Sequence, residues 1–236
     1  MMSDPAWTPR PPYFRRVARL WLAGIVAAAS AVTIAGAIVT DHANAIQPRK
    51  SPAALANREA TGIQQRLVKL HYLPADAITG RWVYRTSQAI MAFQAWQGLA
   101  RDGDPGPLTR AALLTAAAPT PRQAGTGRVI EVFRAKGVTL LVNDSRLVRA
   151  VHSSSGKPGL QTPSGTFQVF RKERNSWSLP YRVWLPYASY FNGGIAFHGY
   201  SSVPAYPASH GCIRIPTPEA AFVYAFAKLG TRVVVY

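Results

Sequence analysis

The hydrophobic pattern of the sequence changes at one place, and this change constrains the fold more than any other feature. Before residue 118, apolar residues such as Ile63, Leu67 and Leu70 recur at helical spacing. From Arg128 onward, short runs rich in Val, Ile, Phe and Tyr alternate with turn residues, which is typical of strands. The 236 residues are enough for two such parts. We therefore expect an α+β multidomain protein.

Residues 57–117 are expected to form the helical domain, after a short tether that ends at residue 56. Thr86 is expected to cap a second helix that ends at Gly98, and residues 108–117 are expected to form a third helix. Residues 118–127 are rich in Pro, Thr and Gly and are expected to be a linker.

Residues 128–236 are expected to form the β-rich domain. Strands are expected at residues 129–133, 138–143, 147–154, 166–171, 194–198, 213–215 and 232–236. One helix is expected over residues 218–229, with Pro at its start and Gly230 at its end. Two aromatic-rich stretches, residues 177–184 and 187–191, are expected to pack in the core or to wall a substrate cleft.

The first 45 residues have the features of an export signal. Four arginines lie between residues 10 and 19, no charge occurs from Leu20 to Val39, and Ala43-Asn44-Ala45 follows. Cleavage after Ala45 and retention of residues 20–39 as a membrane anchor are alternatives. Both place the rest of the chain outside the cytoplasm, in the periplasm or cell wall.

The chain is strongly basic, with a formal net charge of +17. Residues 46–236 keep 23 basic and eight acidic residues, so the charge belongs to the exported part. Such a charge favours an anionic partner, here an anionic cell envelope, and the alternative is that it only serves solubility. The sequence has no recognition helix, zinc-finger spacing or RNP-like strand, so we do not expect nucleic acid as a partner.

Cys212 is the only cysteine in the sequence, which excludes an intramolecular disulfide and a cysteine-built metal site. His198 ends a predicted strand, and the loop of residues 199–209 returns the chain to Cys212. A hairpin-like return would bring imidazole and thiol together, as a Cys–His nucleophile requires. The alternative is that Cys212 is an ordinary buried apolar residue.

Two neighbours of Cys212 add to this chemistry. Gly211 leaves backbone N–H groups unshielded, and these can stabilise an oxyanion. Arg214 lies two residues beyond Cys212, so on a strand it faces the same side and can bind a carboxylate. His152, in the middle of a predicted strand, is expected to be a packed or edge histidine. No metal or cofactor is implied.

At these residues the chain resembles the YkuD-type L,D-transpeptidase family. The family signature is His-Gly followed at a distance by Ser-His-Gly-Cys, a hydrophobic residue and Arg or Asn, and residues 209–214 match it throughout. Residues 162–167 resemble the Thr-Pro-x-Gly-x-Phe hairpin of the family, and eleven residues separate His198 from His210. The resemblance spans residues 128–236 and implies β-sandwich-like mixed sheets with one helix.

The resemblance also implies roles for the residues that carry the motif. Cys212 would be the nucleophile and His198 the base, with the carbonyl of Gly199 orienting the imidazole. His210 and the backbone of Gly211 and Cys212 would shape the oxyanion hole.

Two further residues would serve substrate binding. Ser209 would hold the loop before Cys212 in place, and Arg214 would bind the donor stem peptide of peptidoglycan.

The implied reaction forms 3–3 crosslinks through a thioester on Cys212. An L,D-carboxypeptidase or hydrolase with the same cysteine, and a non-catalytic cell-wall-binding protein, are the alternatives. A sortase is disfavoured because its Cys and Arg are expected on separate strands.

The helical part resembles the small three-helix peptidoglycan-binding modules. Residues 63–67, 89–94 and 98–103 carry this resemblance. In the first loop, where the family usually has Asp-Gly, residues 78–82 read Ile-Thr-Gly-Arg-Trp. A glycine turn before a threonine-initiated helix also occurs twice, at Gly80, Thr86, Gly106 and Thr109. The resemblance implies binding of peptidoglycan, with a spacer lacking a ligand as the alternative.

Overall fold

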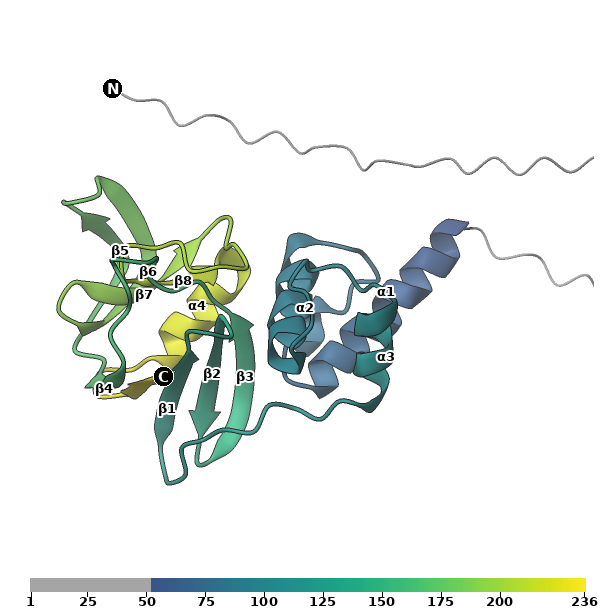
Figure 1. Ribbon diagram of the computed structural model, residues 1–236, viewed down its shortest axis with the longest axis horizontal. Helices are drawn as coiled ribbons and strands as arrows, with labels where there is room; N and C mark the ends of the chain where they lie inside the picture. The colour runs from purple at the N-terminus through teal and green to yellow at the C-terminus, as the bar shows by residue number, and fades with distance from the viewer. Residues whose placement is uncertain (1–51) are drawn as a thin grey trace, which may run out of the picture. The chain divides into compact units, whose positions relative to one another are not determined.

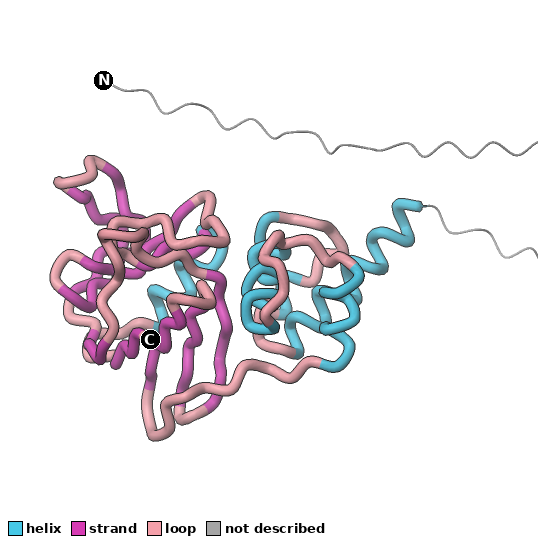
Figure 2. Tube along the Cα trace, viewed as in Figure 1, coloured by secondary structure: helices cyan, strands magenta, loops and turns pink. Residues whose placement is uncertain are grey.

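The computed structural model describes residues 52–236 of the chain (Figure 1). The predicted export signal and membrane anchor, residues 1–45, lie outside the described residues. Within residues 52–236, no helix has both the length and the apolar character that crossing a bilayer requires. Figure 2 shows helices in the N-terminal part of this range and strands in most of the remainder, as the change of pattern predicts.

The N-terminal part, called here the helical module (residues 52–115), contains α1 (Pro52–Lys69), η1 (Ala75–Ala77), α2 (Tyr84–Gln97) and α3 (Pro107–Thr115). Gly98 ends α2 in the left-handed conformation, with a φ of 73°, as predicted. The prediction of a tether up to residue 56 was wrong in part, because α1 already begins at Pro52.

A buried glutamine explains why the prediction for Thr86 was wrong. Helix α2 begins two residues earlier, so Thr86 lies inside the helix and is not its N-cap. Its hydroxyl instead accepts a hydrogen bond from Nε2 of Gln64 on α1, at 3.0 Å. Oε1 of Gln64 accepts from the backbone N–H groups of Thr79 and Gly80, each at 2.9 Å. Gln64 thus ties the first loop to the following helix.

Gln94 on α2 makes the equivalent set of contacts in the second half of the module. Its Oε1 accepts from the N–H of Gly103 at 2.9 Å, and its Nε2 donates to the hydroxyl of Thr109 at 3.1 Å. The internal repeat is therefore real, but the structural counterpart of Gly80 is Gly103 rather than Gly106.

The strands of the described range form two mixed sheets. The five-stranded sheet has the order β3 (Arg146–His152), β2 (Val138–Asn143), β1 (Arg128–Phe133), β9 (Arg232–Val235) and β4 (Gly165–Gln168). The four-stranded sheet has the order β5 (Arg171–Ser178), β6 (Val183–Asn192), β7 (Ile195–Tyr200) and β8 (Ile213–Pro216). The β1–β9 and β7–β8 pairs are parallel, and the other pairs are antiparallel.

The hairpin of β5 and β6 was not predicted as strands. The expected strand over residues 166–171 covers β4 except for Gly165, and reaches the first residue of β5. The two aromatic-rich stretches lie mainly in β5 and β6. Most side chains of β5 are polar and at least partly exposed. Its sequence therefore lacks the alternation of apolar and polar residues that identifies a strand with one buried face.

The five-stranded sheet is buried on both faces. One face, called the inner face, packs against the four-stranded sheet and α4 (Thr217–Phe226) through residues such as Ile130, Leu141, Val233, Phe197, Ile213 and Val223. The opposite face, called the outer face, packs against the helical module through residues such as Val129, Phe133, Val138, Leu140, Leu67 and Phe93. Burial on both faces explains why β1 and β2 read as nearly continuous apolar runs.

Candidate active site

The predicted hairpin-like return to Cys212 was wrong, because β7 and β8 are parallel, and this parallel pairing brings the motif residues onto one sheet. His198 lies opposite Arg214, and Phe197 lies opposite Ile213. Because successive side chains of a strand point to opposite faces, His198 and Arg214 share one face of the sheet, and Phe197 and Ile213 share the other. Cys212 immediately precedes β8 and packs against Ala196 of β7, which lies two residues before His198 and therefore on the same face. The thiol, the imidazole and the guanidinium thus lie on one side of the paired strands.

The thiol of Cys212 lies in a largely apolar setting. It packs against a small cluster, and its Sγ lies 3.8 Å from the carbonyl oxygen of Gly194. The cluster consists of Leu185, Ala188, Tyr190 and Ala196. Burial raises the pKa of the Cys212 thiol, while the backbone N–H of Ala196 and the charge of Arg214 act in the opposite direction. The free thiol therefore predominates at neutral pH.

His198 is buried, and one of its ring nitrogens is engaged. Its Nδ1 lies 3.0 Å from the carbonyl oxygen of Gly199, so Nδ1 carries the proton and Nε2 is left as an acceptor. Burial lowers the pKa of His198 to about 4, against the effect of the Gly199 hydrogen bond and together with the charge of Arg214. The imidazole is therefore neutral at physiological pH and can accept a proton.

Ser209 organises the turn that precedes Cys212. Its hydroxyl donates to the carbonyl oxygen of Cys212 and accepts from the N–H of Gly211 at 3.1 Å. The carbonyl oxygen of Gly211 in turn accepts from the hydroxyl of Thr162 at 2.7 Å. Gly211 has a φ of 119°, a conformation that favours glycine. Sequence reasoning gave Thr162 no role, although it lies in the Thr-Pro-x-Gly-x-Phe segment.

His210 is exposed and stacks on an aromatic ring from the β5–β6 hairpin. The ring centroids of His210 and Tyr181 are 4.4 Å apart, with an interplanar angle of 24°. Tyr181 lies in the turn between the two strands, so the hairpin tip reaches the motif. Tyr181 was not singled out from the sequence, because it is one of several aromatic residues there and lies 29 positions before His210.

Arg214 lies over the ring of Tyr200, with 4.0 Å between its guanidinium carbon and the ring centroid. Tyr200 follows His198 by two residues and therefore lies on the same face. No carboxylate within residues 52–236 pairs with Arg214. Its guanidinium can therefore receive a carboxylate of a bound molecule. The alternation along β7 could have identified Tyr200 from the sequence.

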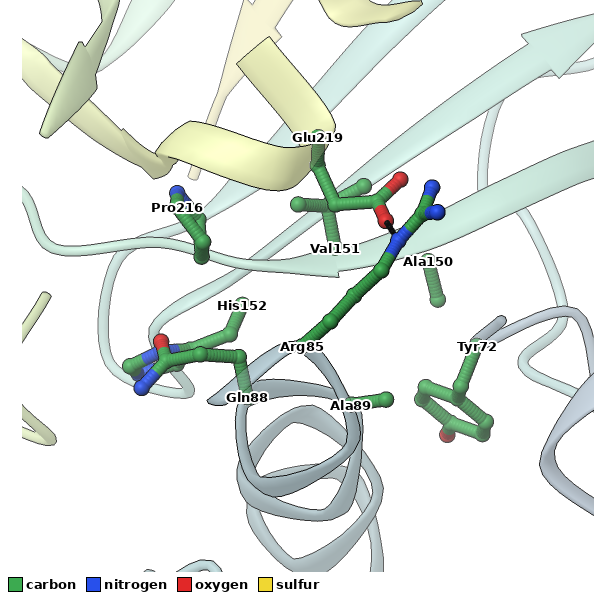
Figure 3. A pocket seen from close by; sticks show the side chains of 9 residues that line it. All are labelled: Tyr72, Arg85, Gln88, Ala89, Ala150, Val151, His152, Pro216 and Glu219. Carbon is green, nitrogen blue, oxygen red and sulfur yellow. Dashed lines mark hydrogen bonds and ion pairs between the residues drawn. The ribbon is translucent and has the colours of Figure 1, made fainter. Parts of the chain in front are cut away.

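A small cavity between α2 and β3 lies apart from these residues (Figure 3). Its volume is about 10 Å³, which is room for at most one water molecule. His152 borders it and is buried, with its Nδ1 2.7 Å from Oε1 of Gln88. Burial, and then the charge of Arg101, lower the pKa of His152 to about 4. The prediction of a packed histidine is confirmed, and the cavity is too small for a substrate.

No cluster of metal-ligating side chains is found in the part of the chain that the structure describes. The residues of β7, of β8 and of the turn before β8 offer a thiol, a neutral imidazole and a guanidinium. This set can carry out acyl transfer at an amide carbonyl.

Comparison with known proteins agrees with this arrangement. Residues 127–235 match the family model of the L,D-transpeptidase catalytic domain, and residues 59–113 match that of a peptidoglycan binding domain. A crystal structure of an L,D-transpeptidase from Xylanimonas cellulosilytica is 37% identical, with a TM-score of 0.71, and the match covers 75% of this chain and 93% of that chain. A search of curated proteins gave no match.

A second solved structure shares the fold at lower identity. It is an L,D-transpeptidase from Stackebrandtia nassauensis, 24% identical, with a TM-score of 0.50 over 77% of this chain and 92% of that chain.

Proposed function

The chain belongs to the L,D-transpeptidase family, and from this premise we propose that it forms 3–3 crosslinks in peptidoglycan through a thioester on Cys212. The observation that carries the proposal is the common face of β7 and β8, which holds His198 and Arg214, with Cys212 immediately before β8 and packed against Ala196 of β7. A thiol and a neutral imidazole on the same face of a sheet are the groups that nucleophilic catalysis by cysteine needs.

In the first step, the sulfur of Cys212 attacks the carbonyl carbon of the amide between the third and fourth residues of a tetrapeptide stem. Nε2 of His198 takes the thiol proton, because its Nδ1 is engaged by the carbonyl of Gly199. The tetrahedral intermediate then expels the amine of D-alanine, which receives the proton from His198. A thioester on Cys212 and free D-alanine result.

The oxyanion is proposed to form beside the turn of residues 209–212. The N–H of Gly211 already donates to Ser209, so Gly211 contributes by its conformation, and the Cys212 N–H and His210 are the proposed donors. Ser209 holds this turn rigid, and Arg214 is proposed to bind a carboxylate of the donor stem.

In the second step, the amine of a neighbouring stem attacks the thioester carbonyl, and its proton passes to His198. The amide bond that forms is the 3–3 crosslink, and the thiol of Cys212 is regenerated. Water in place of the amine would give a tripeptide, which is the product of an L,D-carboxypeptidase.

The location of the protein is part of the same proposal. As a member of a cell-wall enzyme family with a helical peptidoglycan-binding domain, the protein is proposed to be exported through residues 1–45. Residues 57–117 are proposed to hold it on peptidoglycan, with residues 118–127 linking them to the catalytic domain of residues 128–236. A bound enzyme meets stem peptides at a higher local concentration.

Intact-mass spectrometry of residues 46–236 with a disaccharide-tetrapeptide tests the reaction, with Cys212→Ala as the matched control. The proposal expects a transient acyl adduct on the wild type alone, together with crosslinked dimer and free D-alanine. An adduct that decays only to tripeptide would identify a hydrolase. No adduct with either the tetrapeptide or a carbapenem would leave a wall-binding protein as the better account.

A further inference from the structure

Three side chains on α2 of the helical module contact three different parts of the β-rich domain. Tyr84, Arg85 and Gln88 lie among the first five residues of the helix, and they contact the loop of residues 201–209, the start of α4 and β3, respectively. Figure 3 shows Arg85 beside Glu219 of α4, and Gln88 beside the histidine of β3. Each of these three parts leads directly to the candidate active site.

The contact of Arg85 reaches the side of His198. Arg85 pairs with the buried carboxylate of Glu219 in the first turn of α4. The next residue, Ala220, lies against Gly199, where an added Cβ would come within 3.0 Å of the Ala220 Cβ. The carbonyl of Gly199 is the group that holds Nδ1 of His198.

The contact of Gln88 reaches the strand of Arg214. Gln88 binds Nδ1 of His152 at the end of β3. Two residues further on, Ser154 and Arg214 exchange two backbone hydrogen bonds, at 3.1 and 2.9 Å. The module is thus connected to the strand of Arg214 through His152 and Ser154.

The contact of Tyr84 reaches the loop that enters the catalytic motif. Its hydroxyl accepts a hydrogen bond from the buried N–H of Val203 at 3.1 Å. Among hydrogen bonds within residues 52–236, this is the one that fixes residues 201–205. The second half of the loop is held by Ser154 and Ser155, which bind the backbone of residues 206–209.

We propose that Tyr84 is a positioning residue for this loop, so that the helical module is part of the active-site structure as well as a wall-binding part. The inference rests on the proposed function of Cys212. The outer face of the five-stranded sheet supports it, because its apolar side chains need the module as a permanent cover. A permanently docked module can hold a loop in one position, whereas a freely tethered module cannot.

The test compares two tyrosine-to-phenylalanine variants of residues 46–236. Tyr84→Phe removes the hydroxyl that holds Val203. Tyr72→Phe is the matched control, because the Tyr72 hydroxyl is buried in the same module and has no hydrogen-bond partner within the described residues. The rate at which a carbapenem acylates Cys212 is followed by intact mass, and amide exchange of residues 201–205 is followed by hydrogen exchange.

In Tyr84→Phe we expect the saturating acylation rate to fall about threefold to tenfold, as the loss of one hydrogen bond implies. The carbapenem concentration for half-saturation should stay unchanged, because the hydroxyl places the loop and is not expected to bind the probe. The thermal midpoint should fall by only about 2–4 °C, because a single buried N–H loses its partner. Exchange of the Val203 amide should increase. Tyr72→Phe should acylate at the wild-type rate.

Three results would overturn the inference. In the first, Tyr84→Phe keeps the wild-type acylation rate and the wild-type amide exchange of residues 201–205. In the second, both variants are slowed equally, and in the third, Tyr84→Phe has a lower thermal midpoint but an unchanged saturating acylation rate. If the wild type forms no adduct, the proposed function fails. Exchange of the Val203 amide in Tyr84→Phe then still decides whether the hydroxyl fixes the loop.

Discussion

Burial acts on Cys212 and His198 in the same sense, because it favours the neutral form of each. It raises the pKa of the thiol and lowers that of the imidazole to about 4. In the structure described, a thiolate–imidazolium pair is therefore not the resting state. We infer that the proton moves when the sulfur attacks, which makes the thiol selective for acylating groups that bind in the site.

The first prediction concerns the pH dependence of this pair. Neutral His198 and protonated Cys212 coexist between pH about 4 and the raised thiol pKa. The carbapenem acylation rate at Cys212 should therefore be level across neutral pH and should fall only as pH drops through about 4, when His198 takes a proton. In His198→Gln, only the thiolate can react, so the rate should rise about tenfold per pH unit. A similar rise in the wild type would exclude His198 as the base.

A second prediction concerns Gly199, whose missing side chain leaves room for α4. An alanine would place its Cβ 3.0 Å from the Cβ of Ala220, so strand or helix must move, at a cost of about 1–3 kcal/mol. The carbonyl that holds His198 moves with the strand. Gly199→Ala should slow acylation about tenfold, since roughly 1.4 kcal/mol corresponds to this factor.

The double variant Gly199→Ala/Ala220→Gly supplies the control for this prediction. It removes the clash and should restore most of the acylation rate. If the single variant retains the wild-type rate, the position of the Gly199 carbonyl does not matter for catalysis.

At the scale of single elements, the helical module depends on two buried amides rather than on side-chain N-caps. Neither α2 nor α3 has a side-chain N-cap hydrogen bond. Gln64 and Gln94 instead satisfy loop N–H groups and tie each loop to the next helix. Removing such an amide leaves several buried polar groups without partners, which costs more than losing one exposed bond.

The third prediction therefore concerns Gln94. Gln94→Leu should destabilise residues 46–236 by about 2–4 kcal/mol, because the Gly103 N–H and the Thr109 hydroxyl lose their partner. Urea unfolding measures the difference. Gln97→Leu, the same change at an exposed position of α2, should change the free energy of unfolding by less than about 0.5 kcal/mol. Equal effects in both variants would contradict the role of the amide.

At the scale of the whole molecule, the helical module and the β-rich domain share one hydrophobic cluster. Phe93 and Leu67 of the module pack with Val138 and Leu140 of β2. The buried carboxylate of Glu219 joins Arg85 of the module to Arg149 of β3. A buried pair of this kind is costly to break by removing one partner, so the module and the β-rich domain stabilise each other.

The fourth prediction follows from this shared core. Residues 46–236 should unfold in one cooperative transition, with tryptophan fluorescence and far-ultraviolet circular dichroism changing together. In Glu219→Ala the same single transition should occur at lower denaturant, with a loss of about 3–5 kcal/mol. Two separate transitions in the wild type would show that the module folds independently.

The sequence by itself determined the order of helical and β-rich parts, the family and the motif that gathers Cys212, His198 and Arg214. These features are local, because the period of a helix or strand and the parity of residues along a strand are set by the backbone. The strand β5 was not predicted, because its largely exposed side chains show no alternation of apolar and polar residues in the sequence. Thr86 was misplaced because a threonine that binds Gln64 looks the same in the sequence as a helix cap.

The tertiary structure alone decided which distant side chains contact the candidate site and the loop that leads to it. Tyr181 reaches His210, Thr162 holds Gly211, and Tyr84 holds Val203 across 119 positions of sequence. No periodicity links such residues, since each contact depends on how complete elements pack against one another. The docking of the helical module on the outer face also depends on how complete elements pack. The apolar side chains of the module can be identified in the sequence, but the sheet face that they contact is defined only once both surfaces have formed.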